Sequence, residues 1–169
     1  MVRRAPAARD FDGWVSQLGV NSCRHRARGH LFSSGPSALP ALRRGLRHAN
    51  PTVRRLCVNL LDRFVDEETV PVLVAALGDE DAGVRARALH ALACDQCKQG
   101  ECRPGEDLWV PQAMGLLVDK DPDLRAAAID ALGRVADHRP EVATALAEVA
   151  DGDRDRGLRG MARRRLATS

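Results

Sequence analysis

Apolar positions recur along this chain at helical spacing when they are counted from four arginines. The four anchors are Arg54, Arg85, Arg125 and Arg159. One residue before each anchor stands Val or Leu, three residues after it stands Cys or Ala, and seven residues after it stands Leu. Offsets of three and four residues place these positions on one face of a helix. The pattern therefore predicts a helix around each arginine whose core face carries the small residue and the leucine.

A polar residue stands four positions before each anchor and predicts where that helix begins. Asn50, Asp81 and Asp121 are suitable N-caps, because their side chains accept hydrogen bonds from the free amides of a first helical turn. Pro51 and Pro122 follow directly, and proline is preorganised for the first helical position. Each signal therefore predicts the start of the second helix of a helical hairpin.

The remaining apolar segments predict the first helices of the same hairpins. Their expected ranges are Ser37–His48, Thr69–Gly78, Val110–Val118 and Glu141–Ala150. A degenerate fifth copy precedes them, with Arg24 as its anchor and Cys23, Ala27 and Leu31 in the three apolar columns.

By residue number the anchors lie 30, 31, 40 and 34 positions apart. Such a period is typical of stacked helical hairpins, and no alternation of apolar and polar residues indicates a strand. We predict an all-α fold, an α-solenoid with a right-handed superhelix of about four to five two-helix repeats. It should form a single domain over residues 11–167, after a flexible N-terminal tail over residues 1–10.

Two-helix units with Asp or Asn followed by Val-Arg at the start of the second helix resemble HEAT repeats of the short bacterial type. The resemblance covers about Asn21 to Ala167. It implies that the repeated Asp and Arg residues form a ladder between adjacent repeats. It also implies that the second helices line the side on which HEAT proteins commonly bind partners. The residues that would be structural by this resemblance are Asp81, Asp121, Arg54, Arg85, Arg125 and Arg159.

Composition and charge add two expectations. The chain has two Trp, three Phe and no Tyr, so its core must consist of Leu, Val and Ala. Residues 1–68 carry 12 Arg against 6 acidic residues, whereas residues 69–141 carry 13 acidic against 8 basic residues. This polarity could steer an extended partner, although solvated faces also vary in charge without any function. No apolar run of about 18 residues and no signal peptide is evident, which favours a soluble, cytoplasmic protein.

The second repeat is about nine residues longer than its predecessor, and the extra length is rich in cysteine. The insertion, residues 94–106, contains Cys94 and Cys97 in a C-x2-C spacing and then Cys102. His90 lies one helical turn before Cys94. Three thiolates and one imidazole make a complete tetrahedral set for structural Zn²⁺ and leave no open position for catalysis. We therefore predict a structural zinc site at His90, Cys94, Cys97 and Cys102.

Other interpretations of the insertion stay open. Its cysteines could be free thiols in a polar loop, or a redox-active or disulfide-bonded C-x2-C pair. His90 could be a plain surface histidine, with Asp95, Glu101 or another histidine as the fourth ligand. Cys23 and Cys57 fall in core columns and read as ordinary buried small residues.

An exposed stripe follows the second helices at one, five and nine residues after each anchor. The candidate partner-binding residues on it are Arg55, Asn59, Arg63, Asp130 and Arg134. No Ser/His/Asp arrangement, phosphate loop or pair of catalytic carboxylates accompanies them. The sequence thus favours a non-catalytic scaffold that binds a protein or peptide.

The alternative is a nucleic-acid binder, or a HEAT protein similar to DNA glycosylases. It would use Arg55, Arg63 and the basic clusters at residues 24–30 and 163–165. Base stacking needs aromatic side chains, however, and this chain has almost none to offer. HEAT-like bilin lyases of photosynthetic bacteria also share the architecture, but no residue of this sequence identifies their chemistry.

Overall fold

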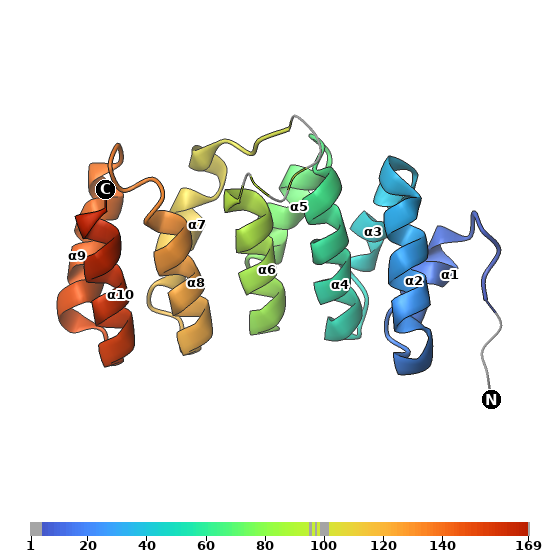
Figure 1. Cartoon of the computed structure of the whole chain (residues 1–169), viewed down its shortest axis with the longest axis horizontal. Coiled ribbons are helices and arrows are strands. Elements are labelled where there is room, and N and C mark those ends of the chain that lie inside the picture. The colour runs from blue at the N-terminus through green and yellow to red at the C-terminus, as the bar shows by residue number, and fades with distance from the viewer. Residues whose placement is uncertain (1–4, 95, 97, 99–101, 169) are drawn as a thin grey trace. The chain divides into compact units, whose positions relative to one another are not determined.

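The structure is a computed structural model that describes residues 5–94, 96, 98 and 102–168 of the chain. Helices and connecting loops account for all of this described part, which contains no strand (Figure 1). None of the helices within it is long and apolar enough to cross a membrane. The chain divides into two compact units, residues 1–103 and 104–169, and each is described by itself below.

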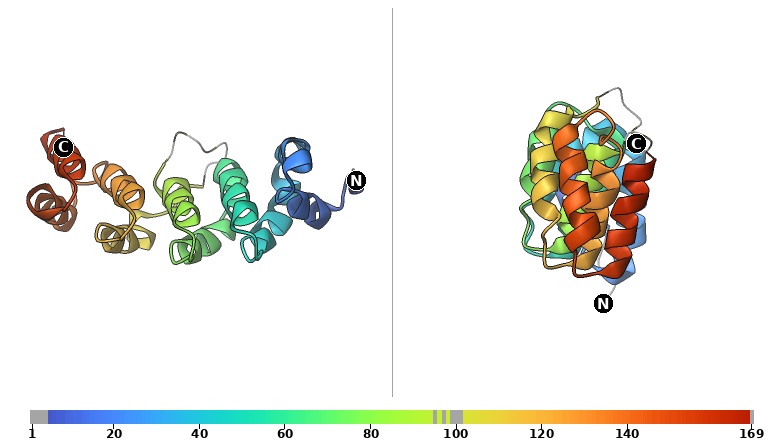
Figure 2. Two further views of the ribbon diagram at one scale, coloured as in Figure 1. Left: turned by 90° about the horizontal axis from the view of Figure 1, so that it is seen from below. Right: turned by 90° about the vertical axis from the view of Figure 1, so that its left-hand side faces the viewer.

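The unit of residues 1–103 consists of three helical hairpins. Its α-helices, in chain order, are α1 (Phe11–Gln17), α2 (Asn21–Ser33), α3 (Leu39–Gly45), α4 (Pro51–Leu61), α5 (Thr69–Ala76) and α6 (Ala82–Ala93). Short 3-10 helices, Gly35–Ala38 and Asp62–Phe64, precede α3 and follow α4. The first helices α1, α3 and α5 form one layer and the second helices α2, α4 and α6 form the other (Figure 2).

The unit of residues 104–169 consists of two hairpins. It begins with a 3-10 turn, Glu106–Leu108, and continues with α7 (Val110–Leu116), α8 (Pro122–Leu132), α9 (Pro140–Gly152) and α10 (Arg156–Ala167). Trp109 is buried at the start of α7. Helices α7 and α8 pack as one hairpin, α9 and α10 as the next, and α10 also packs on α8.

The predicted second helices are confirmed at their starts. Asn50, Asp81, Asp121 and Asp155 each accept a hydrogen bond from a backbone amide two or three residues later. The all-α fold and the expected helix pairs are also confirmed. The right-handed superhelix and the single domain over residues 11–167 stay predictions.

The degenerate first copy is a complete hairpin, because α1 precedes α2. This helix is only seven residues long, and Asp10 caps it by accepting from the Gly13 amide at 2.9 Å. Part of the expected N-terminal tail contacts the same hairpin. The Trp14 indole donates to the Ala7 carbonyl at 3.0 Å, and a ring nitrogen of His30 lies 2.7 Å from the Ala8 carbonyl.

The apolar columns of the sequence lie in the core. The small residue three positions after each anchor is fully buried in α4, α6, α8 and α10, as it is in the degenerate copy in α2. A methyl group added to Gly45 of α3 would come within 2.5 Å of the Cys57 sulfur, so these two helices pack in direct contact. Burial raises the pKa of the Cys57 thiol to about 12, which makes this cysteine a structural residue.

Buried ion pairs connect consecutive hairpins within each unit. Arg54 donates to both carboxylate oxygens of Asp79 at 2.8 and 2.9 Å. In the other unit Arg125 donates to both oxygens of Asp153 at 2.8 and 3.1 Å. The side chains of Arg125 and Asp153 are only 4% and 5% exposed.

These pairs correct the ladder implied by the resemblance. The carboxylates that meet the anchor arginines are Asp79 and Asp153, each two residues before a capping aspartate. Asp81 and Asp121 instead cap helices, since the side chain of an N-cap points at its own first turn. Asp81 lies 3.4 Å from the Arg55 guanidinium, and Arg55 is not an anchor.

The leucine column predicts a graded loss of stability on truncation. Leu132→Ala should lower the free energy of unfolding by about 2–5 kcal/mol, because the fully buried side chain leaves a cavity. Leu166 occupies the same column but is only half-buried, so Leu166→Ala is the matched control and should cost less. Urea denaturation followed by circular dichroism measures both. Equal losses would contradict the assignment of this column to the core.

The Arg125–Asp153 pair predicts a stability that depends on pH. Hydrogen bonds from Arg125 hold the pKa of Asp153 below its usual value of 3.8. The pair's contribution is therefore complete above the unfolded-state pKa and is lost as the pH falls through the lower folded-state pKa. Asp153→Asn should cost about 3 kcal/mol at neutral pH, because it leaves a buried guanidinium without its counter-charge.

This difference from the native chain should shrink in acid, where folding no longer gains the full benefit of an ionised Asp153. Urea denaturation of both proteins at neutral pH and near pH 3 measures it. Arg163→Ala is the control, since its contact with Asp151 at 3.7 Å is exposed and should contribute little. A deficit of Asp153→Asn that is equal at both pH values would contradict the assigned role.

Candidate functional site

A groove lies between α2 and α4 on the face that the second helices form in residues 1–103. Its volume is about 370 Å³. Four lining residues come from α2, and the other three come from the second half of α4 and the turn that follows it. They are His25, Arg28, Gly29, Phe32, Asn59, Leu60 and Arg63.

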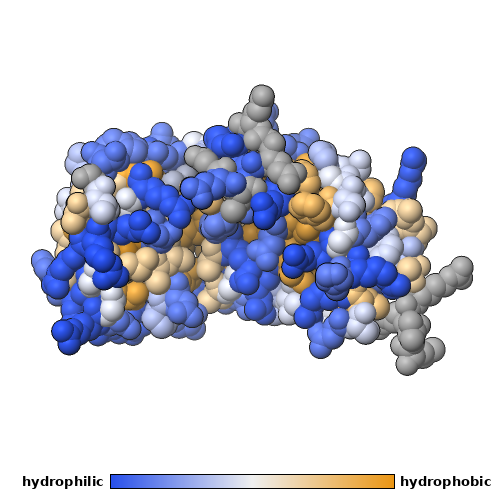
Figure 3. Space-filling view, viewed as in Figure 1, coloured by the Kyte–Doolittle hydropathy of each residue, from blue (hydrophilic) through white to orange (hydrophobic). Residues whose placement is uncertain are grey.

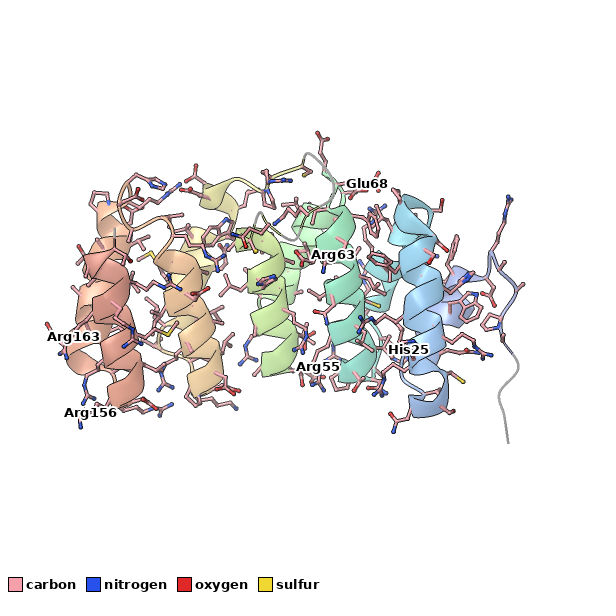
Figure 4. The ribbon with its side chains drawn as sticks, in the orientation of Figure 1. His25, Arg55, Arg63, Glu68, Arg156 and Arg163 are labelled. Carbon is pink, nitrogen blue, oxygen red and sulfur yellow. The ribbon has the colours of Figure 1, made fainter. Side chains whose placement is uncertain are left out.

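The repeat explains why these residues face one another. Helices α2 and α4 begin at the same end of their hairpins (Figure 1). Gly29 and Asn59 both stand five residues after an anchor, so they lie at the same level of the groove. Figure 4 shows His25 nearer the N-terminal end of α2 and Arg63 toward the C-terminal end of α4.

The charge of the groove is positive. His25, Arg28 and Arg63 are exposed, and no carboxylate is among the lining residues. Within the described part of the chain, neither His25 nor Arg28 forms an ion pair. The Arg28 guanidinium therefore remains available to an anionic group from outside.

The floor of the groove is apolar and open. Phe32 is 42% exposed, and its ring lies 5.7 Å from the ring of Phe64. Leu60 is buried beneath the groove. A methyl group added to Gly29 would meet no atom within 4 Å, and the backbone there has no positive φ. Neither packing nor backbone geometry therefore requires a glycine at this position. In Figure 3 hydrophobic residues are exposed among hydrophilic ones on this face.

In this unit, only two of the three predicted partner-binding residues line the groove. Asn59 and Arg63 line the groove, as the sequence indicates for an exposed binding face. Arg55 does not line it, because its guanidinium turns to Asp81 at the start of α6, 3.4 Å away (Figure 4).

The other two stripe residues lie in residues 104–169 and contact one another. Arg134 donates to Asp130 at 2.5 Å, and Arg165 of α10 donates to the second oxygen of the same carboxylate. These contacts tie α8 to α10. A role of Asp130 and Arg134 in partner binding stays a prediction.

A larger groove of about 600 Å³ lies between α7 and α9 in residues 104–169. Val118 on its edge is 86% exposed. Its two arginines already have partners, since Arg125 pairs with Asp153 and Arg154 donates to the Lys120 carbonyl. This groove lies among first helices and offers an exposed aliphatic side chain.

The structure describes three of the four predicted zinc ligands, because Cys97 lies outside the described residues. Cys94 is buried at the C-terminal end of α6, Cys102 is half-buried, and His90 is on the surface of α6. A ring nitrogen of His90 lies 3.7 Å from Asp62, whose side chain is 10% exposed. Among residues 5–94, 96, 98 and 102–168, no three His, Cys, Asp or Glu side chains gather closely enough to hold a metal ion.

From the sequence, the α2 side of the groove is predicted only as part of the basic cluster at residues 24–30. His25 and Gly29 stand one and five residues after Arg24, so they occupy the same stripe as Arg55 and Asn59. Extending the stripe to the degenerate copy would have placed both residues opposite α4. Phe32 and Arg28 lie outside those columns, and only the packing of α2 on α4 brings them into the groove.

Known proteins share this architecture. The sequence profile of HEAT repeats matches residues 39–107 and 100–167. No curated protein matches the chain. A similar solved structure is the complex of CpcE and CpcF of phycocyanin lyase from Nostoc sp. PCC7120, with a TM-score of 0.71 and 20% identity over 94% of this chain and 98% of that chain.

A second similar structure is an engineered protein solved by the Northeast Structural Genomics Consortium. Its TM-score is 0.57 and its identity is 21%, over 94% of this chain and 78% of that chain. At these identities the likeness shows the fold alone. The profile, in contrast, matches most of the sequence, and the chain belongs to the HEAT-repeat family.

Proposed function

We propose that this chain is a non-catalytic interaction module that binds a protein or peptide partner on the second-helix face of residues 1–103. The observation that carries the proposal is the groove between α2 and α4, where Arg28 and Arg63 stand beside the exposed ring of Phe32. An apolar floor with a few charged groups around it is the usual composition of a peptide-binding groove.

Two further points support a protein partner. HEAT repeats stack into extended surfaces, and such surfaces are suited to binding other polypeptides. The similar structure from Nostoc is a complex of CpcE with CpcF, so a protein of this fold assembles with another protein there. By analogy, this chain would act by holding a partner.

The nucleic-acid alternative has less support from the same surface. Duplex or single-stranded nucleic acid presents a run of phosphates, and tight binding needs several cations along its path. Arg55, which the alternative requires, is engaged with Asp81. Phe32 is the one Phe, Tyr or Trp side chain that lines the groove, which gives a poor platform for stacking successive bases.

Groove variants should separate these functions. The immobilised native chain should retain a partner from an extract of its source organism, and a chain carrying Arg28→Glu and Arg63→Glu should not. The captured protein is then purified and titrated by calorimetry, where the double substitution should weaken binding by about tenfold or more. Val118→Arg, in the larger groove between α7 and α9, is the matched control and should leave binding unchanged.

Two results would contradict the proposed function. One is a partner that is lost with Val118→Arg and kept with the double substitution. The other is nanomolar binding of a duplex oligonucleotide with a steep salt dependence, which would favour the nucleic-acid alternative.

We also propose that the cysteine insertion holds one structural Zn²⁺ through Cys94, Cys97 and Cys102, with His90 as the fourth ligand. Asp62 beside the His90 ring could fix its orientation, as carboxylates do for metal-binding histidines. Lys98 is buried and donates to the Cys94 carbonyl, and a thiolate-rich site would offset that buried positive charge.

Elemental analysis tests the zinc proposal on protein purified without added metal. The native chain should carry about one zinc per molecule. Cys97→Ser should lose it, and Cys23→Ala, in the core of α2, should keep it. Zinc content should decrease as the pH is lowered, because the ligands must be deprotonated to bind the metal. A native chain without zinc contradicts the proposal, and full zinc in His90→Ala contradicts only the role of His90.

A further inference from the structure

We infer that the occupant of the groove between α2 and α4 is an acidic peptide segment whose apolar side chain inserts over Gly29. This inference rests on the proposed function and adds the chemistry of the partner. It follows from three properties of the groove, namely its length, its charge and the space above one glycine.

The length of the groove fits a short extended segment. Its lining runs from His25 near the start of α2 to Arg63 just beyond α4. His25 stands one position after its anchor, Arg24, and Arg63 stands nine positions after its anchor, Arg54. Eight residues of helix rise about 12 Å. An extended chain advances about 3.3 Å per residue, so three or four residues of a partner span this distance.

The charge selects an acidic segment. Two arginines and one histidine surround the groove, and no carboxylate lines it. Arg28 can donate two hydrogen bonds to one carboxylate, whereas a basic segment would be repelled. Asn59 also lines the groove and offers both an amide donor and a carbonyl acceptor, which suits the backbone of an extended peptide.

The apolar part of the groove selects an anchor side chain. Phe32 is 42% exposed, and Leu60, which is buried, also lines the groove. Gly29, three residues before Phe32 on the same helix, carries no side chain, and the space that its Cβ would enter contains no other atom within 4 Å. Glycine inside a helix weakens that helix, and nothing in the fold requires it here. The glycine therefore keeps open a place for a leucine, methionine or aromatic side chain of the partner.

The apolar surface and the surrounding charges favour a peptide over a polynucleotide. A phosphate backbone would satisfy the arginines but brings no aliphatic side chain to Phe32 and Leu60. Acidic residues also follow the groove at its Arg63 end, with Glu67 and Glu68 exposed on the next turn (Figure 4). A long polyanion that continued past Arg63 would approach those carboxylates, whereas a short acidic segment can end before them.

Selection from a phage-displayed library of random short peptides tests the inference on the full-length chain. The selected peptides should share Asp or Glu next to a large apolar residue. A synthetic peptide of that consensus, labelled with fluorescein, should bind the native chain, and its affinity should fall at least about tenfold in Arg28→Glu and in Gly29→Leu. Gly29→Leu should also raise the melting temperature, because leucine is a far better helix former than glycine.

The matched control for Gly29→Leu is Gly115→Leu in α7. An added Cβ at Gly115 likewise meets nothing within 4 Å, but the residue lies in the other unit. This variant should bind the peptide as the native chain does. Variants whose melting temperature and helix content do not fall below the native values exclude misfolding as the cause of lost binding.

The outcomes separate this inference from the proposed function. A neutral or basic consensus whose binding is lost in Gly29→Leu overturns the acidic occupant and leaves a peptide-binding groove. The absence of any peptide whose binding depends on Gly29 and Arg28 overturns both. Tighter binding of a single-stranded or duplex oligonucleotide than of the selected peptide, with loss in Arg28→Glu, also overturns the inference.

Discussion

One arginine at the start of each second helix donates hydrogen bonds to the loop that precedes that helix. Arg54 in one unit and Arg125 in the other also pair with a carboxylate of the next hairpin. Arg54 donates to the carbonyls of His48 and Ala49 in its own hairpin and to Asp79 in the next. Arg125 does the same with the Asp119 carbonyl and Asp153. A guanidinium can be buried at such a junction only if its donors are satisfied, and these partners satisfy them.

The carboxylate of each pair has a second role, which explains its spacing in the sequence. Asp79 accepts from the Asp81 amide as well as from Arg54, and Asp153 likewise accepts from the Asp155 amide. The residue that receives the arginine thus also shapes the turn that presents the N-cap. Two aspartates separated by one residue are needed because one carboxylate cannot both cap its own helix and reach back to the preceding hairpin.

Much of the fold could be predicted from the sequence because it depends on local patterns. Helix starts follow from capping residues, and the core columns follow from helical spacing. The ladder partner was wrong because an aspartate two residues from the cap looks equivalent to it until the direction of each side chain is known. The groove could be predicted only on its α4 side, at Asn59 and Arg63. Its α2 side depends on how the degenerate copy packs, and periodicity does not give that.

The groove opens at a junction where, among the described residues, the anchor arginine does not pair with a carboxylate of the next hairpin. Arg24 is the anchor of α2, but it donates to the Leu18 carbonyl and to Asn21 within its own hairpin. The position equivalent to Asp79 is His48, which accepts from the Asn50 amide and thereby keeps only the local half of the carboxylate's role. This junction packs mainly through the first helices α1 and α3, between which Arg44 and Asp12 also form an exposed ion pair at 2.7 Å.

Among the described residues, no ion pair connects the starts of the second helices α2 and α4, because Arg24 and His48 bond within their own hairpins. The surface between them is lined by Arg28, Gly29 and Phe32 among others. Departure from the repeat at Arg24 and His48 therefore coincides with the exposed cations and the open apolar floor. In a solenoid whose other positions are constrained by stacking, such a junction is where a binding surface can develop without loss of stability.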